Sequence, residues 1–295
     1  MKSFKGTGVA LVTPFNSDKS IDYESLQKLV EYVINGGVNY LVVMGTTAEN
    51  PTLNSIEKQN VIKFIVEKNN KRVPIVLGVG GYDTNAVIEN IKQINNNEIA
   101  SILSVSPYYN KPNQIGLYEH FSAIAESSQL PIILYNVPGR TGVNITASTT
   151  LKLSKDFKNI IGIKEASGNI EQIMEIIEKK NDGFEVISGD DGLTLPLISV
   201  GAIGVISVVA NALPKDFSNM VNFALSGKYS EAKEIHYKML EFTRLIFAEG
   251  SPAGVKCALK KLGIIENILR LPLVPVSNEL SMKIENILKK SNIKL

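Results

Sequence analysis

The stretch Ile160-Ile161-Gly162-Ile163-Lys164 is a short apolar run that ends in a charged side chain. The run is continuous rather than alternating, as expected for a strand of a parallel sheet that is covered on both faces. Comparable runs rich in Val, Ile and Leu bring the set to eight, the others being residues 8–12, 40–44, 74–78, 101–105, 131–135, 184–188 and 202–206. Eight such strands with helices between them predict an α/β (β/α)8 barrel (a TIM barrel). A doubly wound open sheet is the alternative that periodicity leaves open.

Helical segments with recognisable ends separate these runs. Asp22 is a candidate N-cap for a helix that Gly36-Gly37 ends. Thr84 is the candidate N-cap of a later helix. From about Pro214 the strand-like runs give way to helical apolar stripes. We therefore predict a barrel over residues 1–225 and a C-terminal helical region, residues 226–295, packed on it.

Composition limits the function classes. The chain has 295 residues, of which 44% are hydrophobic and 20% charged, and its net charge is +2. These values are typical of a soluble globular protein with a large core, and they favour neither a nucleic-acid partner nor a membrane surface. The N-terminus lacks the apolar core of a signal peptide, and no run approaches the roughly 20 apolar residues of a membrane span.

The metal-binding and redox side chains are few. Cys257 is a single cysteine, and His120 and His236 are the two histidines. One cysteine cannot form an intramolecular disulfide, and this set cannot build a Cys/His zinc site. We expect a cytoplasmic protein with no metal ion and no organic cofactor.

Lys164 is the unusual residue of the predicted site. The active site of a β/α barrel lies at the C-terminal ends of the strands. Most lysines of this chain lie on polar helix faces or in loops, whereas Lys164 lies inside an apolar run. An inward-facing lysine loses hydration there, which favours the neutral amine that attacks a ketone to form an imine. The alternative is a structural lysine paired with Glu165 or with an aspartate at the rim.

Other strand ends carry polar side chains that could accompany this lysine. Tyr135 and Tyr109 are candidate acid/base groups, or they fill core volume with a hydroxyl at the surface. Arg140, one of four arginines, follows a Pro-Gly turn, where it could bind a carboxylate through two hydrogen bonds or form a surface ion pair. Thr46 and Thr47 add two hydroxyls at the end of another strand.

Two further motifs suggest cofactors but are weak. Gly78-Val79-Gly80-Gly81 resembles a dinucleotide fingerprint, yet Asp83 stands where a third glycine would fall. Asp190-Asp191 could suggest a metal site, although adjacent acids in a loop more often are solvated or accept hydrogen bonds from local backbone.

Five segments occur in the order and spacing of one known family. They are Gly45-Thr46-Thr47-Ala48-Glu49, Ser106-Pro107-Tyr108-Tyr109, Tyr135-Asn136-Val137-Pro138-Gly139-Arg140-Thr141-Gly142, Gly162-Ile163-Lys164-Glu165-Ala166-Ser167-Gly168 and Ser188-Gly189-Asp190-Asp191. With them the chain resembles the dihydrodipicolinate synthase / N-acetylneuraminate lyase family of pyruvate-dependent class-I aldolases. The resemblance covers essentially the whole chain and implies a barrel lyase that forms homotetramers as dimers of dimers.

The resemblance also implies the catalytic roles. Lys164 would form an imine with pyruvate, and Thr47 would bind the pyruvate carboxylate. Tyr135 would be the central acid/base group. Thr46 would link Tyr135 to Tyr109 in a proton relay, and Tyr109 would be donated by the neighbouring subunit.

The second substrate depends on Arg140. Its segment resembles the synthase branch of the family, in which this arginine binds the carboxylate of L-aspartate-4-semialdehyde. The implied product is 4-hydroxy-tetrahydrodipicolinate, in the diaminopimelate and lysine pathway. Gly189 and Ile206 match positions whose backbone lines the lysine pocket. The alternatives are a related aldolase with another aldehyde partner, of the N-acetylneuraminate lyase or ketodeoxy-sugar acid type, and a non-catalytic sensor or scaffold.

Regulation is where the chain departs from lysine-inhibited family members. Their lysine cleft carries basic rings and a glutamate, whereas this chain has Ser55, Lys58, Tyr82 and Ala86 there, with Tyr108 retained. A cationic Lys58 and a missing carboxylate disfavour a cationic ligand. We predict weak or absent feedback inhibition by lysine.

Overall fold

The computed structural model describes residues 4–94 and 97–290. Eight parallel strands form a closed barrel in sequence order, so the prediction of a (β/α)8 barrel is confirmed and the open sheet is excluded. The strands are β1 (Gly6–Ala10), β2 (Tyr40–Val43), β3 (Ile75–Gly78), β4 (Ser101–Val105), β5 (Ile132–Asn136), β6 (Ile160–Glu165), β7 (Glu185–Ser188) and β8 (Gly204–Ser207).

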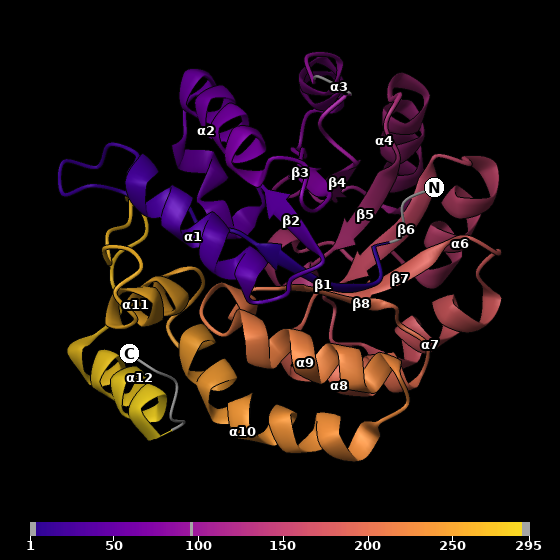
Figure 1. Ribbon diagram of the computed structural model, residues 1–295. Helices are drawn as coiled ribbons and strands as arrows, with labels where there is room; N and C mark the ends of the chain where they lie inside the picture. The colour runs from indigo at the N-terminus through magenta and orange to yellow at the C-terminus, as the bar shows by residue number, and fades with distance from the viewer. Residues whose placement is uncertain (1–3, 95–96, 291–295) are drawn as a thin grey trace.

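Helices surround the barrel and continue beyond it (Figure 1). The helices that follow the first seven strands are α1 (Tyr23–Asn35), α2 (Ser55–Asn69), α3 (Thr84–Lys92), α4 (Gln114–Ser127), α5 (Pro138–Thr141), α6 (Ala147–Asp156), α7 (Ile170–Lys179) and α8 (Thr194–Ser199). Those after β8 are α9 (Pro214–Leu225), α10 (Tyr229–Phe247), α11 (Ala253–Lys261) and α12 (Asn278–Lys290). No described helix is long and apolar enough to cross a membrane.

The barrel closes where β1 meets β8, and glycines allow that contact. Gly6 pairs with Gly204 in the β1–β8 register. Gly204 has φ +154°, and a Cβ atom there would lie 2.0 Å from the Gly6 carbonyl oxygen. Only glycine fits so close an approach of two backbones.

Alternation along the strands separates two cores. Ile132 and Leu134 of β5 face the helices, whereas Ile133 and Tyr135 face the barrel interior. The period of two therefore directs Tyr135 inward. Its partner in the β5–β6 register is Lys164, which lies beside it.

Helix ends follow local capping chemistry. The Asp22 side chain accepts from the backbone N–H of Ser25 and Gly36 is the C-cap, which confirms the predicted limits of α1. The predicted cap of α3 is wrong by one residue, because Asp83 accepts from two backbone N–H groups and takes that position. Thr84 is the first helical residue, and its hydroxyl lies 2.8 Å from Nδ1 of His120.

The C-terminal helices form a separate layer. α9 completes the ring because it packs against β1 and β8, whereas α10, α11 and α12 pack on one another outside it (Figure 1). The predicted division after residue 225 falls in the turn between α9 and α10. The helical nature of this region is as predicted, and the division into two parts stays a prediction.

Candidate active site

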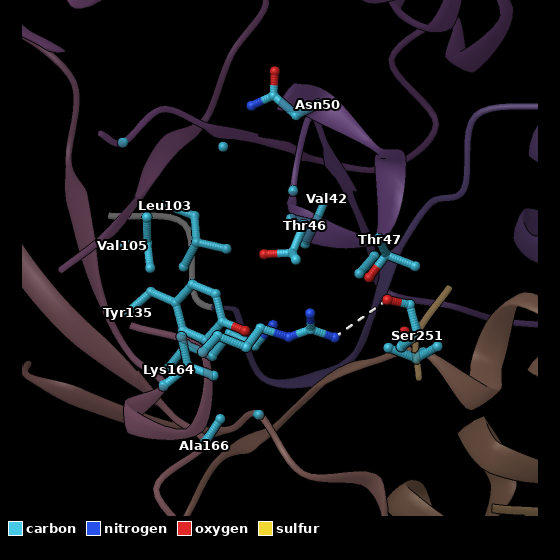
Figure 2. A pocket seen from close by; sticks show the side chains of 18 of the residues that line it. Val42, Thr46, Thr47, Asn50, Leu103, Val105, Tyr135, Lys164, Ala166 and Ser251 are labelled. Atoms are coloured by element: carbon cyan, nitrogen blue, oxygen red, sulfur yellow. Dashed lines mark hydrogen bonds between the residues drawn. The ribbon is translucent and has the colours of Figure 1, made fainter. Parts of the chain in front are cut away.

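A cavity of about 460 Å³ opens at the C-terminal ends of the strands. Six of the eight predicted site residues line it: Thr46, Thr47, Tyr135, Arg140, Lys164 and Gly189. Figure 2 shows Thr46 and Thr47 on one side of the cavity, across from Tyr135 and Lys164. The barrel thus brings together side chains from β2, β5, β6 and β7 and the loops that follow them.

Lys164 is buried in the inner wall of the barrel, with 6% of its surface exposed. Its Nζ lies 4.2 Å from the centroid of the Tyr135 ring. The Glu165 carboxylate points the other way and accepts hydrogen bonds from Asn136 (2.6 Å) and Ser167 (3.0 Å). Glu165 is therefore not an ion-pair partner of Lys164, and the Lys164 amine faces the cavity.

Gly189 makes room for this lysine. A Cβ atom at position 189 would lie 2.9 Å from Cε of Lys164 and 2.7 Å from Cβ of Ala166. Any larger residue at position 189 would displace the lysine stem. The backbone at the end of β7 therefore also limits where the Lys164 side chain can lie.

Thr46 and Thr47 lie on a short 3-10 turn, Thr46–Ala48, directly after β2. Met44 before the turn and Glu49 after it both have left-handed backbones, with φ of 58° and 56°. Such conformations are costly for non-glycine residues and mark turns that the surrounding structure holds in place. They direct both threonines toward the cavity.

Arg140 lies on the short helix α5, at the mouth of the cavity. Its guanidinium donates a hydrogen bond to the backbone oxygen of Ser251 at 3.3 Å, drawn as a dashed line in Figure 2. Ser251 and Phe247 also line the cavity, and both come from the C-terminal region. No local sequence signal points to these two residues, because only the tertiary fold brings them to the barrel.

The two remaining predicted residues lie elsewhere. Tyr109 is 89% exposed, does not line the cavity, and has a left-handed backbone with φ 69°. Ile206 is buried inside the barrel in the same apolar cluster as Tyr135, and Val208 lines the cavity at the end of β8. Neither residue lines the cavity of the single chain.

The two adjacent acids at the end of β7 accept hydrogen bonds from nearby groups of the protein. Asp190 caps a short turn by accepting from the backbone N–H groups of Gly192 and Leu193. Asp191 is buried and accepts from the hydroxyl of Ser207 and from the N–H of Val208. Burial raises the pKa of Asp191 to about 6, although these hydrogen bonds oppose the rise. Within the described residues, no group of three or more His, Cys, Asp or Glu side chains could hold a metal ion.

A buried polar network supports the wall behind Lys164. The Asn136 side chain donates to Glu165 and accepts from the N–H of Ile145 (2.9 Å), so it ties the ends of β5 and β6 to the following loop. Gln172 on α7 donates to Glu165 at 3.3 Å. Burial raises the pKa of Glu165 to about 7, and the hydrogen bonds from Asn136, Ser167 and Gln172 oppose it.

Comparison with known proteins agrees with this geometry. The model of the dihydrodipicolinate synthetase family matches residues 3–291. The chain belongs to this family.

Related sequences and structures extend the match over the full length. The 4-hydroxy-tetrahydrodipicolinate synthase of Parabacteroides distasonis is 54% identical over 99% of this chain and 98% of its own. The dihydrodipicolinate synthase structure from Thermotoga maritima has 40% identity and a TM-score of 0.96, covering 98% of this chain and 99% of the other. An Acinetobacter baumannii dihydrodipicolinate synthase complexed with pyruvate has 41% identity and a TM-score of 0.95, covering 99% and 100%.

Proposed function

We propose that this protein is a class-I lyase that condenses pyruvate with L-aspartate-4-semialdehyde to give 4-hydroxy-tetrahydrodipicolinate, in diaminopimelate and lysine biosynthesis. The observation that carries the proposal is the buried Lys164 amine at the wall of a cavity that also holds two threonine hydroxyls, a phenol and an arginine. The relatives that match the whole chain carry the name of this activity.

The chemistry begins at Lys164. Its neutral amine attacks the pyruvate ketone, and loss of water gives an imine. The imine makes the pyruvate methyl acidic, and loss of a proton gives an enamine. Tyr135, beside Lys164, manages the protons in these steps. Thr47 binds the pyruvate carboxylate through its hydroxyl and backbone N–H.

The enamine carbon then attacks the aldehyde carbon of the second substrate, and the aldehyde oxygen becomes the 4-hydroxyl group. The amine of this substrate displaces Lys164 by transimination, which closes the ring and frees the lysine. Arg140 holds the carboxylate of the second substrate, with Ser251 fixing the direction of its guanidinium. Gly189 and the backbone at Ile206 shape the lysine pocket.

Assembly completes the site in this proposal. Thr46 connects Tyr135 to Tyr109 of a neighbouring copy, and the protein forms dimers that pair into homotetramers. Three features of Tyr109 support this role: its exposure, its position outside the cavity and its strained backbone. Strain of this kind persists at sites where the conformation serves a function. The enzyme works in the cytoplasm.

Trapping with borohydride tests the proposal. Incubation with pyruvate and borohydride, followed by mass spectrometry, is expected to place a reduced adduct on Lys164 and to give none in Lys164→Ala. Product formation after addition of aspartate semialdehyde separates the synthase from an aldolase with another partner. Arg140→Ala is expected to weaken the second-substrate step and keep the pyruvate adduct. A wild-type protein with no adduct would refute the imine chemistry.

Weak or absent inhibition by lysine stays a prediction from Ser55, Lys58, Tyr82 and Ala86. Lys58 lines a second cavity, between α2 and α3, and is half-buried there, which lowers its pKa. Inhibition assays with lysine check this prediction, and an inhibition constant in the micromolar range would contradict it.

A further inference from the structure

A buried ion pair joins the threonine turn to the C-terminal helices. Glu49 directly follows the 3-10 turn that carries Thr46 and Thr47, and Lys256 lies on α11. The Lys256 ammonium donates to the Glu49 carboxylate, and both side chains are fully buried. Neither residue lines the active-site cavity, so the pair does not contact substrate.

The surroundings satisfy both charges. The Lys256 ammonium also donates to the backbone oxygen of Ile268 (2.8 Å) and lies 4.2 Å from the centroid of the Phe15 ring. The second carboxylate oxygen of Glu49 accepts from the backbone N–H of Arg270 at 3.0 Å. Burial lowers the pKa of Lys256 to about 8, while Glu49 acts in the opposite direction. Because desolvation offsets the attraction in such pairs, a buried ion pair is a poor source of net stability and a better means of fixing geometry.

Arg270 holds the next 3-10 turn, Asn50–Thr52, which directly follows Glu49. Its guanidinium donates to the backbone oxygen of Thr52 (2.9 Å) and forms a paired contact with Glu57 on α2 (2.9 and 2.6 Å). On the other side of the turn, the Thr13 hydroxyl donates to the backbone oxygen of Ala48 at 2.7 Å. The turn that carries Thr46 and Thr47 is therefore held from the loop after β1 and, through Glu49 and the next turn, from the C-terminal region.

The fixed turn is also a strained one. Glu49, directly after the turn, has a left-handed backbone, as does Met44, two residues before it. A left-handed backbone is unfavourable for a non-glycine residue, so this segment relaxes when its restraints are removed. Loss of the ion pair would thus free the turn that positions both threonines, while leaving Arg140 on α5 in place.

We propose that Lys256 and Arg270 are positioning residues that hold Thr46 and Thr47 in their catalytic geometry. Lys256 acts through Glu49, and Arg270 acts through Glu49 and Thr52. The inference rests on the proposed function. The C-terminal region thereby positions the residues that bind pyruvate. It also supplies the Ser251 carbonyl, which accepts a hydrogen bond from Arg140.

Steady-state kinetics with each substrate varied in turn tests the inference. Lys256→Met keeps the length of the side chain and removes its charge. Its kcat/KM for pyruvate is expected to fall about 10- to 100-fold, the scale of a small misplacement of reacting groups. The KM for aspartate semialdehyde should change less than about twofold, because the hydrogen bond of Arg140 goes to Ser251 and not to either member of the ion pair. Glu49→Gln is expected to lower the kcat/KM for pyruvate in the same selective way, but by a smaller factor than Lys256→Met.

Lys261→Met is the matched control. Lys261 lies on the same helix and forms an ion pair with Glu285 on α12 (2.6 Å), which does not reach the turn. Its kinetics should equal those of the wild type. The inference is refuted if Lys256→Met and Glu49→Gln keep the wild-type kcat/KM for pyruvate, or if both substrates are affected alike. If Lys256→Met does not fold, Glu49→Gln alone decides. A wild type that forms no pyruvate adduct refutes the proposed function itself, before any variant is compared.

Discussion

Tyr135 and Lys164 lie side by side because the β5–β6 register pairs them. Both face the barrel interior, while their neighbours Asn136 and Glu165 face outward and bind each other. One register therefore builds the reactive pair and the network that supports it. A shift by one residue would exchange the two faces.

Replacing Tyr135 by Phe tests the acid/base role at this position. The ring keeps its packing against Lys164, so the fold and the melting temperature should be unchanged. We expect kcat to fall by about 100-fold or more, since a positioned acid/base group contributes on this scale. Steady-state assays measure this loss, with Tyr118→Phe as the control on the protein surface. A kcat within about twofold of the wild type would contradict the role.

Glu165 gives a prediction about pH and stability. Its folded-state pKa of about 7 lies above the ordinary value of 4.5, so the folded protein binds this proton more tightly than the unfolded chain. Its contribution to stability is fully present below pH 4.5 and is lost as the pH rises toward 7.

Glu165→Gln removes this titration. Relative to the wild type, the variant should gain stability between pH 5 and pH 8, by at most about 3 kcal/mol. Urea unfolding of both proteins at the two pH values measures the gain. An equal stability difference at both pH values would show that Glu165 does not titrate in this range.

Individual helices and strands follow patterns that the sequence displays. The Leu26, Leu29, Val30 and Val33 stripe of α1 is buried, and its end residues cap it as predicted. The helix is therefore held mainly by one apolar face against the barrel.

Leu29→Ala on this face should destabilise the protein by about 3 kcal/mol, because it leaves a cavity in a closely packed core. Gln27→Ala on the exposed face of the same helix should change stability by less than about 0.5 kcal/mol. Urea unfolding midpoints compare the two variants. Equal effects would mean that the buried stripe does not anchor α1.

The strands and the limits of α1 could be read from local sequence. The positions of polar residues at strand ends, together with the family resemblance, pointed to six residues that line the cavity. Other features depend on the tertiary fold. Apolar runs located the strands to within two residues, because burial on both faces leaves a strong signal. Thr84 was mistaken for a cap because Asp83 beside it is an equally good one. Ser251 and Lys256 could not be assigned to the site or its support, because nothing in their local sequence says which loop they meet.

At the scale of the whole molecule, the proposed role of Tyr109 can be tested only in an assembly of at least two chains. If Tyr109 serves the neighbouring site, a dimer of one Lys164→Ala chain and one Tyr109→Phe chain contains one intact site. Refolding the two inactive variants together should restore about a quarter of the wild-type activity, as random pairing gives half mixed dimers.

A matched mixture controls this experiment. Lys164 and Tyr135 belong to the same chain's site, so mixed dimers of Lys164→Ala and Tyr135→Phe contain no intact site. That mixture should stay as inactive as its parents. Recovery of activity in both mixtures, or in neither, would contradict the assignment of Tyr109 to the neighbouring copy.

The position of Ser251 has a consequence for how the molecule is made. A ribosome completes β8 some 40 residues before it adds Ser251. The carbonyl that orients Arg140 is therefore synthesised after every strand of the barrel. A chain that ends after α9 would contain Lys164, Tyr135 and both threonines but would lack the carbonyl partner of Arg140, which orients the second carboxylate in the proposed mechanism.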